Sequence, residues 1–230
     1  MTVQILTQPL SNPAALARRT MVDGQVRTYD VTNLDVIDRL LSVPREAFLP
    51  PALEARAYSD AALALPGQPP RRLLAPMVLA RLLQAAAISP EDRVLDLAGG
   101  LGYGAALIAG LAREVVMVEA DAGRVSAANA AFAQLGLANA RAVPGEVANG
   151  AAAAAPFNLV ILNGAFERLP AALLAQIAPG GRLVGVRAQS DVVGEAVRLD
   201  VAQGTVGERP LFSCHADMIE GFAKPTGFAF

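Results

Sequence analysis

From Arg93 onward, short apolar runs alternate with helical stretches, and this alternation limits the fold more than any other feature. Strands that are buried on both faces read as continuous apolar runs, because helices cover both sides of a parallel sheet. The pattern therefore predicts an α/β fold with a doubly wound parallel sheet. The predicted strands are 94–98, 115–119, 141–143, 159–163 and 183–186, and the predicted helices between them are 104–111, 123–135 and 169–177.

The residues that precede this alternation are predicted to be mostly helical. Asn12-Pro13 is a good entry to a helix over 14–22, because proline is favoured in a first turn. A second helix is predicted from a cap at Thr32 or Asn33 to Pro44. A third is predicted over 77–87, after a proline-rich stretch, 59–76, that is predicted to be a loop.

The last part of the chain departs from the βαβ pattern. Apolar residues alternate over 196–201, Gln203-Gly204 is predicted to turn, and a segment through Phe212 follows without a helix. We therefore predict two antiparallel closing strands. We expect residues 1–76 to form a helical cap with a substrate loop, and residues 77–230 to form the ligand-binding α/β domain.

Composition and net charge argue against several classes of binding partner and site. A formal net charge of −2 without a basic stretch argues against nucleic acid, because phosphate neutralisation requires a basic face. Cys214 and His215 are the only residues of their types, so we expect no intrachain disulfide and no metal site built from cysteines or histidines. We also expect neither a signal peptide nor a spanning helix, and we place the protein in the cytoplasm.

A glycine-rich turn follows the first predicted strand, in the run from Asp96 to Tyr103. Glycine lets the backbone bend sharply and lie against a ligand with no Cβ in the way. The next strand ends in Glu119, whose carboxylate is suited to accept two hydrogen bonds from a ribose diol. Gly145-Glu146 follows the third strand and offers a carboxylate to an adenine amino group. Parallel strands end at one edge of the sheet, where open α/β sheets bind ligands.

The form of this turn favours S-adenosylmethionine over a dinucleotide. Ala98 replaces the first glycine, and no G-x-G-x-x-G pattern is present. A tight turn without a ligand remains the alternative for the loop taken alone. The residues predicted to bind the cofactor, or its product S-adenosylhomocysteine, are Asp96, Ala98, Gly99, Gly100, Gly102, Tyr103, Glu119 and Glu146.

Several of these residues also have structural interpretations. Tyr103 either lines the crevice beside the sulfonium or packs at a helix start. Asp96 hydrogen-bonds either the loop or the cofactor's amino group. Asn163 and Gly164 end the fourth strand, where they face the reacting region or form a turn. His215 is interpreted as a surface or packing residue of the last strand.

Over nearly its whole length the sequence resembles the protein-L-isoaspartate O-methyltransferase family. The Val-Pro-Arg-Glu-x-Phe element and the Gly-Tyr pair after the glycine turn are the most specific of the matches. The resemblance implies a seven-stranded, Rossmann-like methyltransferase sheet with an N-terminal helical cap. It also implies a carboxylate of a protein or peptide as methyl acceptor. The matching stretches are 21–27, 43–50, 57–60, 94–103, 173–177 and 179–183.

The chain departs from the family pattern on the acceptor side. The family loop reads Gly-Gln-Thr-Ile-Ser-Gln-Pro, and alignment on Pro76 puts Leu74 at the position of the serine that touches substrate. Arg72 either supplies the lost contact to an anion or belongs to a solvated arginine pair on a loop. The family's Gly-Asp and Thr-Ala-Ala-Ala are replaced by Gly145-Glu146 and by residues 162–165. The predicted substrate-side residues are Arg72, Leu73, Leu74, Asn163 and Gly164.

Loss of the serine does not by itself abolish the chemistry. A carboxylate is already ionised and nucleophilic at neutral pH, so its methylation requires no general base, and no catalytic residue is assigned. We expect Leu74 to reduce isoaspartyl methylation strongly, because an apolar wall desolvates the anion without a hydrogen bond. A cofactor-binding protein that is catalytically silent and a methyltransferase for small molecules are the two alternatives.

Overall fold

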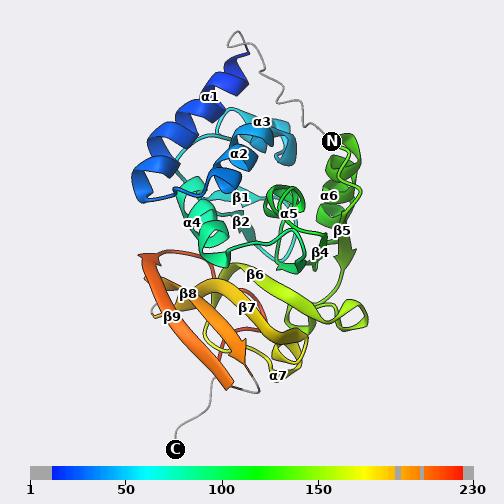
Figure 1. The fold of residues 1–230 in the computed structure, drawn as a ribbon. Coiled ribbons are helices and arrows are strands. Elements are labelled where there is room, and N and C mark those ends of the chain that lie inside the picture. Colours follow the sequence, from blue (N-terminus) through cyan, green and yellow to red (C-terminus); the bar gives the residue numbers. More distant parts are fainter. Residues whose placement is uncertain (1–11, 190–192, 203–204, 225–230) are drawn as a thin grey trace, which may run out of the picture.

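The computed structural model describes residues 12–189, 193–202 and 205–224. Its main sheet has seven strands in the order β5-β4-β3-β6-β7-β8-β9 (Figure 1). The first five strands in this order run parallel, and β8 and β9 pair antiparallel beyond them, as predicted. The strands are β3 (Arg93–Leu97), β4 (Glu114–Glu119), β5 (Ala140–Pro144), β6 (Phe157–Phe166), β7 (Ile177–Ala188), β8 (Gly194–Ala202) and β9 (Thr205–Cys214).

Both faces of the sheet are covered, which explains the continuous apolar strands. Val94 and Val115 pack toward the side of α4 (Pro76–Ala86), α5 (Tyr103–Ala109) and α6 (Ala122–Gln134). Leu95 and Val116 point to the other face, where α7 (Ala171–Leu174) lies below the sheet in Figure 1. Alternate residues of one strand thus serve two separate apolar cores.

The N-terminal helices lie on the same side of the sheet as α4 (Figure 1). Asn33 caps α2 (Leu34–Ser42), since its side chain accepts from the Val36 amide at 3.0 Å. The first helix is α1 (Pro13–Met21), extended by a π turn (Val22–Val26) and a 3₁₀ turn (Arg27–Tyr29). A further 3₁₀ turn (Arg45–Phe48) precedes α3 (Pro51–Glu54).

Two predictions of secondary structure are wrong. Residues 59–76 are not all loop, because β1 (Leu63–Leu65) and β2 (Arg71–Leu73) pair as an antiparallel hairpin. The leucines of this hairpin, Leu63, Leu65 and Leu73, are buried. The sequence did not indicate this, because the surrounding prolines favoured a loop. The helix predicted over 169–177 is confined to α7, because Ile177 already pairs with Phe157 in the sheet. The turn predicted at Gln203-Gly204 lies outside the described residues.

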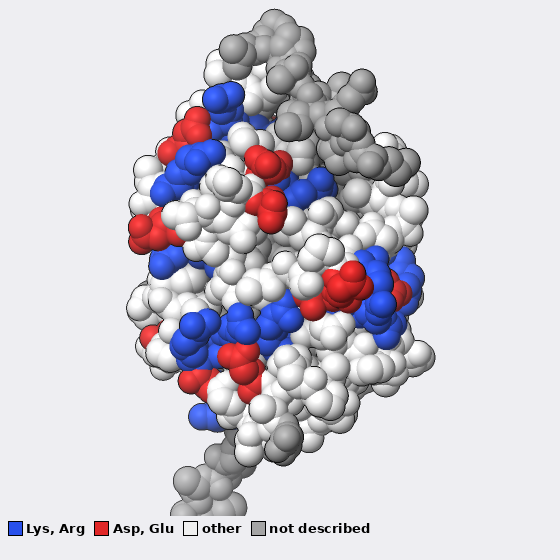
Figure 2. All heavy atoms as spheres, viewed as in Figure 1, with Lys and Arg blue, Asp and Glu red and all other residues white. Residues whose placement is uncertain are grey.

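Charged side chains of both signs are interspersed on the face shown in Figure 2. Basic groups there have acidic neighbours, as expected for a chain with a net charge of −2. Among the described residues, no helix is long and apolar enough to cross a bilayer.

Candidate active site

The ends of three neighbouring parallel strands meet at one edge of the sheet, as predicted. Leu97 of β3 pairs with Val118 of β4, and Glu119 pairs with Pro144 of β5. The Gly100 amide donates to the Glu119 carboxylate at 3.1 Å, and the Gly145 amide donates to the Glu119 carbonyl oxygen at 3.1 Å. Glu119 is therefore the residue that connects the three strand ends.

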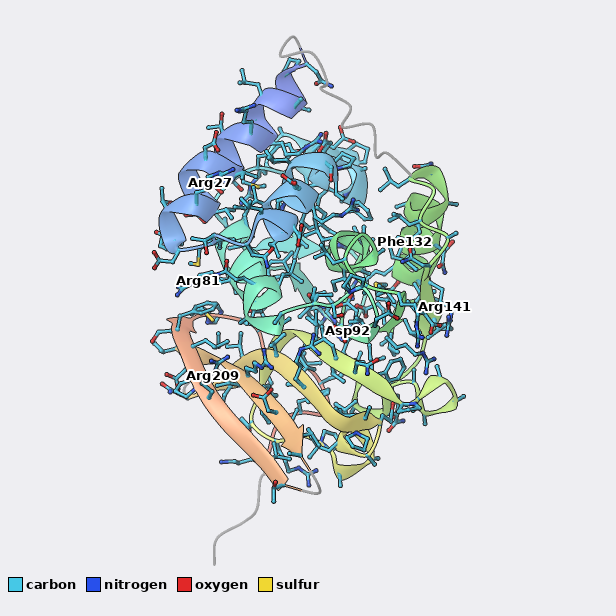
Figure 3. The ribbon with its side chains drawn as sticks, viewed as in Figure 1. Arg27, Arg81, Asp92, Phe132, Arg141 and Arg209 are labelled. Carbon is cyan, nitrogen blue, oxygen red and sulfur yellow. The ribbon has the colours of Figure 1, made fainter. Side chains whose placement is uncertain are left out.

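The glycine turn bends through left-handed backbone conformations between β3 and α5. Gly100 and Gly102 have φ values of 61° and 94°, and Ala98 has a φ of 56° despite its side chain. Such a conformation costs a non-glycine residue about 1–2 kcal/mol. A Cβ on Gly102 would lie 2.8 Å from the ring of Phe132 on α6, which Figure 3 labels. Glycine at this position permits close packing as well as the turn.

A second close approach explains Gly99. A Cβ built there would lie 2.5 Å from the sulfur of Met117 and 2.6 Å from Oδ2 of Asp96. No side chain fits between β4 and this part of the turn. The turn is thus held tightly against the strand ends, with its backbone facing the edge of the sheet.

Asp96 is a fully buried acid under the turn. Asn163 donates to its Oδ1 at 2.6 Å and to the Leu97 carbonyl at 3.0 Å. Burial raises the pKa of Asp96 to about 7, Asn163 acts against that shift, and the nearby charge of Glu119 adds to it. Asp96 Oδ2 is buried without a hydrogen-bond partner among the described residues. The chemistry of this carboxylate oxygen suits an ammonium donor.

Two arginines of the chain itself hold the Glu119 carboxylate. Arg71 Nε of β2 lies 3.4 Å from Oε2, and Arg124 Nη1 of α6 lies 3.4 Å from Oε1. The Ala120 amide also donates to Oε1 at 2.9 Å. Glu119 is completely buried, and Arg71 is only 6% exposed. The solvated arginine pair considered from the sequence is therefore wrong for Arg71, whereas Arg72 is exposed.

The β1–β2 hairpin covers this carboxylate. The Leu65 side chain lies 2.6 Å from the point where Gly100 would carry a Cβ. The Pro66 carbonyl accepts from Arg124 Nε at 2.8 Å, and the Gln68 amide donates to Asp121 at 3.0 Å. Sequence reasoning missed this cover, because no local pattern connects a hairpin to a strand end about fifty residues away.

Two cavities flank the hairpin. The larger, about 440 Å³, lies between the hairpin, the segment around Phe48 and the start of α6, and Arg124 lines it. The smaller, about 20 Å³, lies on the acceptor side. Its lining includes Arg72, Leu74, Asn163, His215 and Asp217.

The acceptor side brings together residues that are distant in sequence. Leu73 and Leu74 are buried, so an apolar wall stands where the family has its serine. Arg72 Nε lies 3.1 Å from Asp217, and His215 Nε2 lies 3.5 Å from the same carboxylate. His215 thus lies beyond β9 at the acceptor cavity, whereas the sequence placed it within the last strand.

A close backbone crossing explains Gly164. A Cβ there would lie 2.6 Å from Ile219 and 2.8 Å from the Asp217 carbonyl oxygen. The Ala165 amide donates to that same carbonyl oxygen at 2.8 Å. Gly164 therefore lets the C-terminal segment lie against β6 beside Asn163.

Tyr103 and Glu146 occupy different surroundings. Tyr103 is buried, with the Arg45 guanidinium 5.0 Å from its ring centre and the Phe48 ring 5.7 Å away. Glu146 is exposed at the strand end, and Asn149 donates to it at 2.9 Å. No group of three or more potential metal ligands occurs among the residues that the structure describes.

Comparison with known proteins gives a consistent family. The sequence profile of "Protein-L-isoaspartate(D-aspartate) O-methyltransferase (PCMT)" matches residues 18–201. A protein-L-isoaspartate O-methyltransferase of Koribacter versatilis is 36% identical over 171 residues, which cover 74% of this chain and 76% of that protein. A relative of the same name from Ruegeria sp. is 34% identical over 202 residues, which cover 87% of this chain and 93% of that protein.

Two solved structures share the fold. A protein-L-isoaspartate O-methyltransferase superposes with a TM-score of 0.77 at 20% identity, covering 89% of this chain and 66% of the other. A Plasmodium falciparum protein, described as a putative protein-L-isoaspartate O-methyltransferase in complex with S-adenosyl-L-homocysteine, superposes with a TM-score of 0.73 at 15% identity. The superposition covers 91% of this chain and 99% of that chain. The chain belongs to the protein-L-isoaspartate O-methyltransferase family of S-adenosylmethionine-dependent enzymes.

Proposed function

We propose that this protein transfers a methyl group from S-adenosylmethionine to a carboxylate of a protein or peptide, of the isoaspartyl type. The observation that carries the proposal is the family match over residues 18–201, within which the glycine turn and Glu119 share one edge of the sheet. We assign the activity to the cytoplasm, in keeping with a single, free cysteine.

The residues of the carboxyl edge fit an adenosyl ligand in type. In our assignment Glu119 receives the ribose hydroxyls, Glu146 lies on the adenine side, and the turn from Ala98 to Gly102 holds the methionine part. Asp96 Oδ2 is buried and accepts no hydrogen bond from the described residues, so we assign it to the amino group of the cofactor. The bound cofactor supplies a methyl group that is activated by its sulfonium.

The work left to the protein is alignment. The acceptor oxygen is already anionic at neutral pH, so the chain need only hold it in line with the methyl group and exclude water. The apolar side chain of Leu74 helps to exclude water, but it cannot hold the acceptor oxygen in line with the methyl group. Arg72 and Asn163, which line the same small cavity, are the groups we assign to the acceptor carboxylate.

A transfer assay with an isoaspartyl peptide tests the function. Purified protein is incubated with S-adenosylmethionine carrying a tritiated methyl group, and a serine-containing relative serves as positive control. We expect slow but measurable transfer that is lost in Glu119→Ala. No transfer under conditions where the relative is active would contradict the proposal.

Leu74→Ser tests the assignment of the acceptor side. A restored hydroxyl can donate to the anion, and a hydrogen bond to a charged group contributes about 1.5–3 kcal/mol. We therefore expect transfer to rise roughly 10- to 100-fold. Leu74→Ala is the matched control, because it opens the same space without a donor. Equal gains in both variants, or full activity in the wild type, would show that Leu74 does not impair acceptor binding.

A further inference from the structure

The Glu119 carboxylate has no free face in this structure. Oε2 receives the Gly100 amide and Arg71, and Oε1 receives the Ala120 amide and Arg124. Its side chain is completely buried. A ribose diol must form its hydrogen bonds to these same two oxygens. An adenosyl ligand therefore has to displace a group that the protein now holds there.

The hydrogen bonding around Glu119 shows which group is the weaker partner. Arg71 and Arg124 each keep an Nη2 that is buried without a hydrogen-bond partner in the described part of the chain. Arg124 is additionally anchored by the Pro66 carbonyl at 2.8 Å. All the contacts of Arg71 are long: 3.4 Å to Glu119, 3.5 Å to the neighbouring Pro70 carbonyl and 3.5 Å to the Glu220 carboxylate. Arg71 is thus held less firmly than Arg124.

Arg71 also has a second acidic neighbour. Its Nη2 lies 3.5 Å from the Glu220 carboxylate, whose side chain is 44% exposed. When Arg71 leaves Glu119, its charge can be retained by this half-exposed group, so a buried unpaired cation does not result. The hairpin that carries Arg71 is short, and its displacement would also move Leu65 away from Gly100.

We propose that Arg71 competes with the ribose of the adenosyl ligand for Glu119, so that binding requires release of this carboxylate by the β1–β2 hairpin. The inference rests on the proposed function only in taking an adenosyl compound as the ligand. It predicts that the protein binds this ligand more weakly than its other site residues would allow, because part of the binding free energy is spent on opening.

Calorimetry with S-adenosylhomocysteine tests the competition. Arg71→Gln keeps much of the side chain's length and removes its charge, so we expect affinity to rise at least tenfold, or about 1.4 kcal/mol. Arg71→Lys retains a cation for Glu119 and should stay within about threefold of the wild type. Arg209→Gln, which removes the charge of an exposed arginine on β9 outside both cavities, is the matched control, and its affinity should not change.

The association rate gives a second readout that a merely structural role would not move. If the hairpin must open first, stopped-flow association should be slow in the wild type and faster in Arg71→Gln. Equal or weaker affinity in a folded Arg71→Gln, including no binding in both proteins, overturns the inference. Urea unfolding of each variant establishes that it is folded.

The wild type offers a test that needs no variant. The Nε–H signal of Arg71, assigned by NMR through bonds to its own backbone, reports the contact with Glu119. Saturation with S-adenosylhomocysteine should shift this signal and speed its exchange with water, whereas an unchanged signal refutes the competition. Tight ligand binding without isoaspartyl methylation would sink the proposed function alone. Methylation with an unaltered Arg71 signal would sink this inference alone.

Discussion

The two ends of the parallel sheet each bury an arginine–carboxylate cluster, and the clusters differ in how completely they are satisfied. At the amino end, Arg182 Nη2 lies 2.6 Å from Asp92, which Figure 3 labels. Arg182 also donates to the Ala86 and Ala87 carbonyls, and the Ser89 amide donates to Asp92 at 2.8 Å. At the carboxyl end, both arginine contacts to Glu119 are 3.4 Å long.

This difference in hydrogen bonding indicates that the cluster at the amino end is structural and that the cluster at the carboxyl end is available for binding. A fully hydrogen-bonded buried network fixes one conformation, whereas a partly satisfied one leaves free energy to be gained from a new partner. Among the described residues, the buried atoms without a hydrogen bond at the carboxyl end include Asp96 Oδ2, Arg71 Nη2 and Arg124 Nη2, although Arg71 Nη2 lies 3.5 Å from the Glu220 carboxylate. None of the Arg182 or Asp92 side-chain atoms is among the unpartnered atoms of the described residues.

The largest expected effect is on stability. Arg182→Met leaves Asp92 buried with the Ser89 amide as its remaining hydrogen-bond partner among the described residues, and breaking such a pair costs about 3–5 kcal/mol. Arg71→Met should cost less, about 1–2 kcal/mol, because Glu119 keeps Arg124 and two backbone amides. Urea unfolding of the two variants measures both values. Equal losses would remove the distinction between the two ends.

A pH dependence should come from the carboxyl end. The pKa of Asp96 is about 7 in the folded protein and 3.8 in its ordinary state, so the folded state binds more protons between these values. The contribution of Asp96 to stability should be greatest below about pH 4 and should be lost as pH rises to about 7, by on the order of 4 kcal/mol. Asp96→Asn should flatten this slope in urea unfolding followed across the same range. A slope that persists in the variant would assign it to other groups.

The smallest expected effect concerns backbone strain, which both ends contain. Ala98 at the carboxyl end and Ala87 at the amino end adopt left-handed conformations, with φ values of 56° and 47°. Replacement of either by glycine should stabilise the protein by about 1 kcal/mol, measured as a raised urea midpoint. A gain at only one end would mean that strain, and not hydrogen bonding alone, separates the two ends.

Local patterns were sufficient to predict most of the fold. Continuous apolar runs such as 159–162 identified the inner strands, because a strand that is buried on both faces has apolar residues at every position. Asn33 and the Asn12-Pro13 pair marked helix starts through capping chemistry. The glycine turn, Glu119 and Gly145 were assigned to one edge because parallel strands end together, and their backbone contacts confirm this.

The hairpin and its consequences required the tertiary structure. Nothing near Arg71 in the sequence indicates that it is buried on Glu119, and the prolines around it favoured a loop. The position of His215 and Asp217 beside Leu74 likewise depends on how the chain returns after β9. The sequence by itself determined the sheet, the glycine turn and the acids at the strand ends, because these follow from local periodicity and parallel topology. Only the tertiary structure decided which side chains hold those acids, because burial and ion pairing arise between segments that are far apart in the chain.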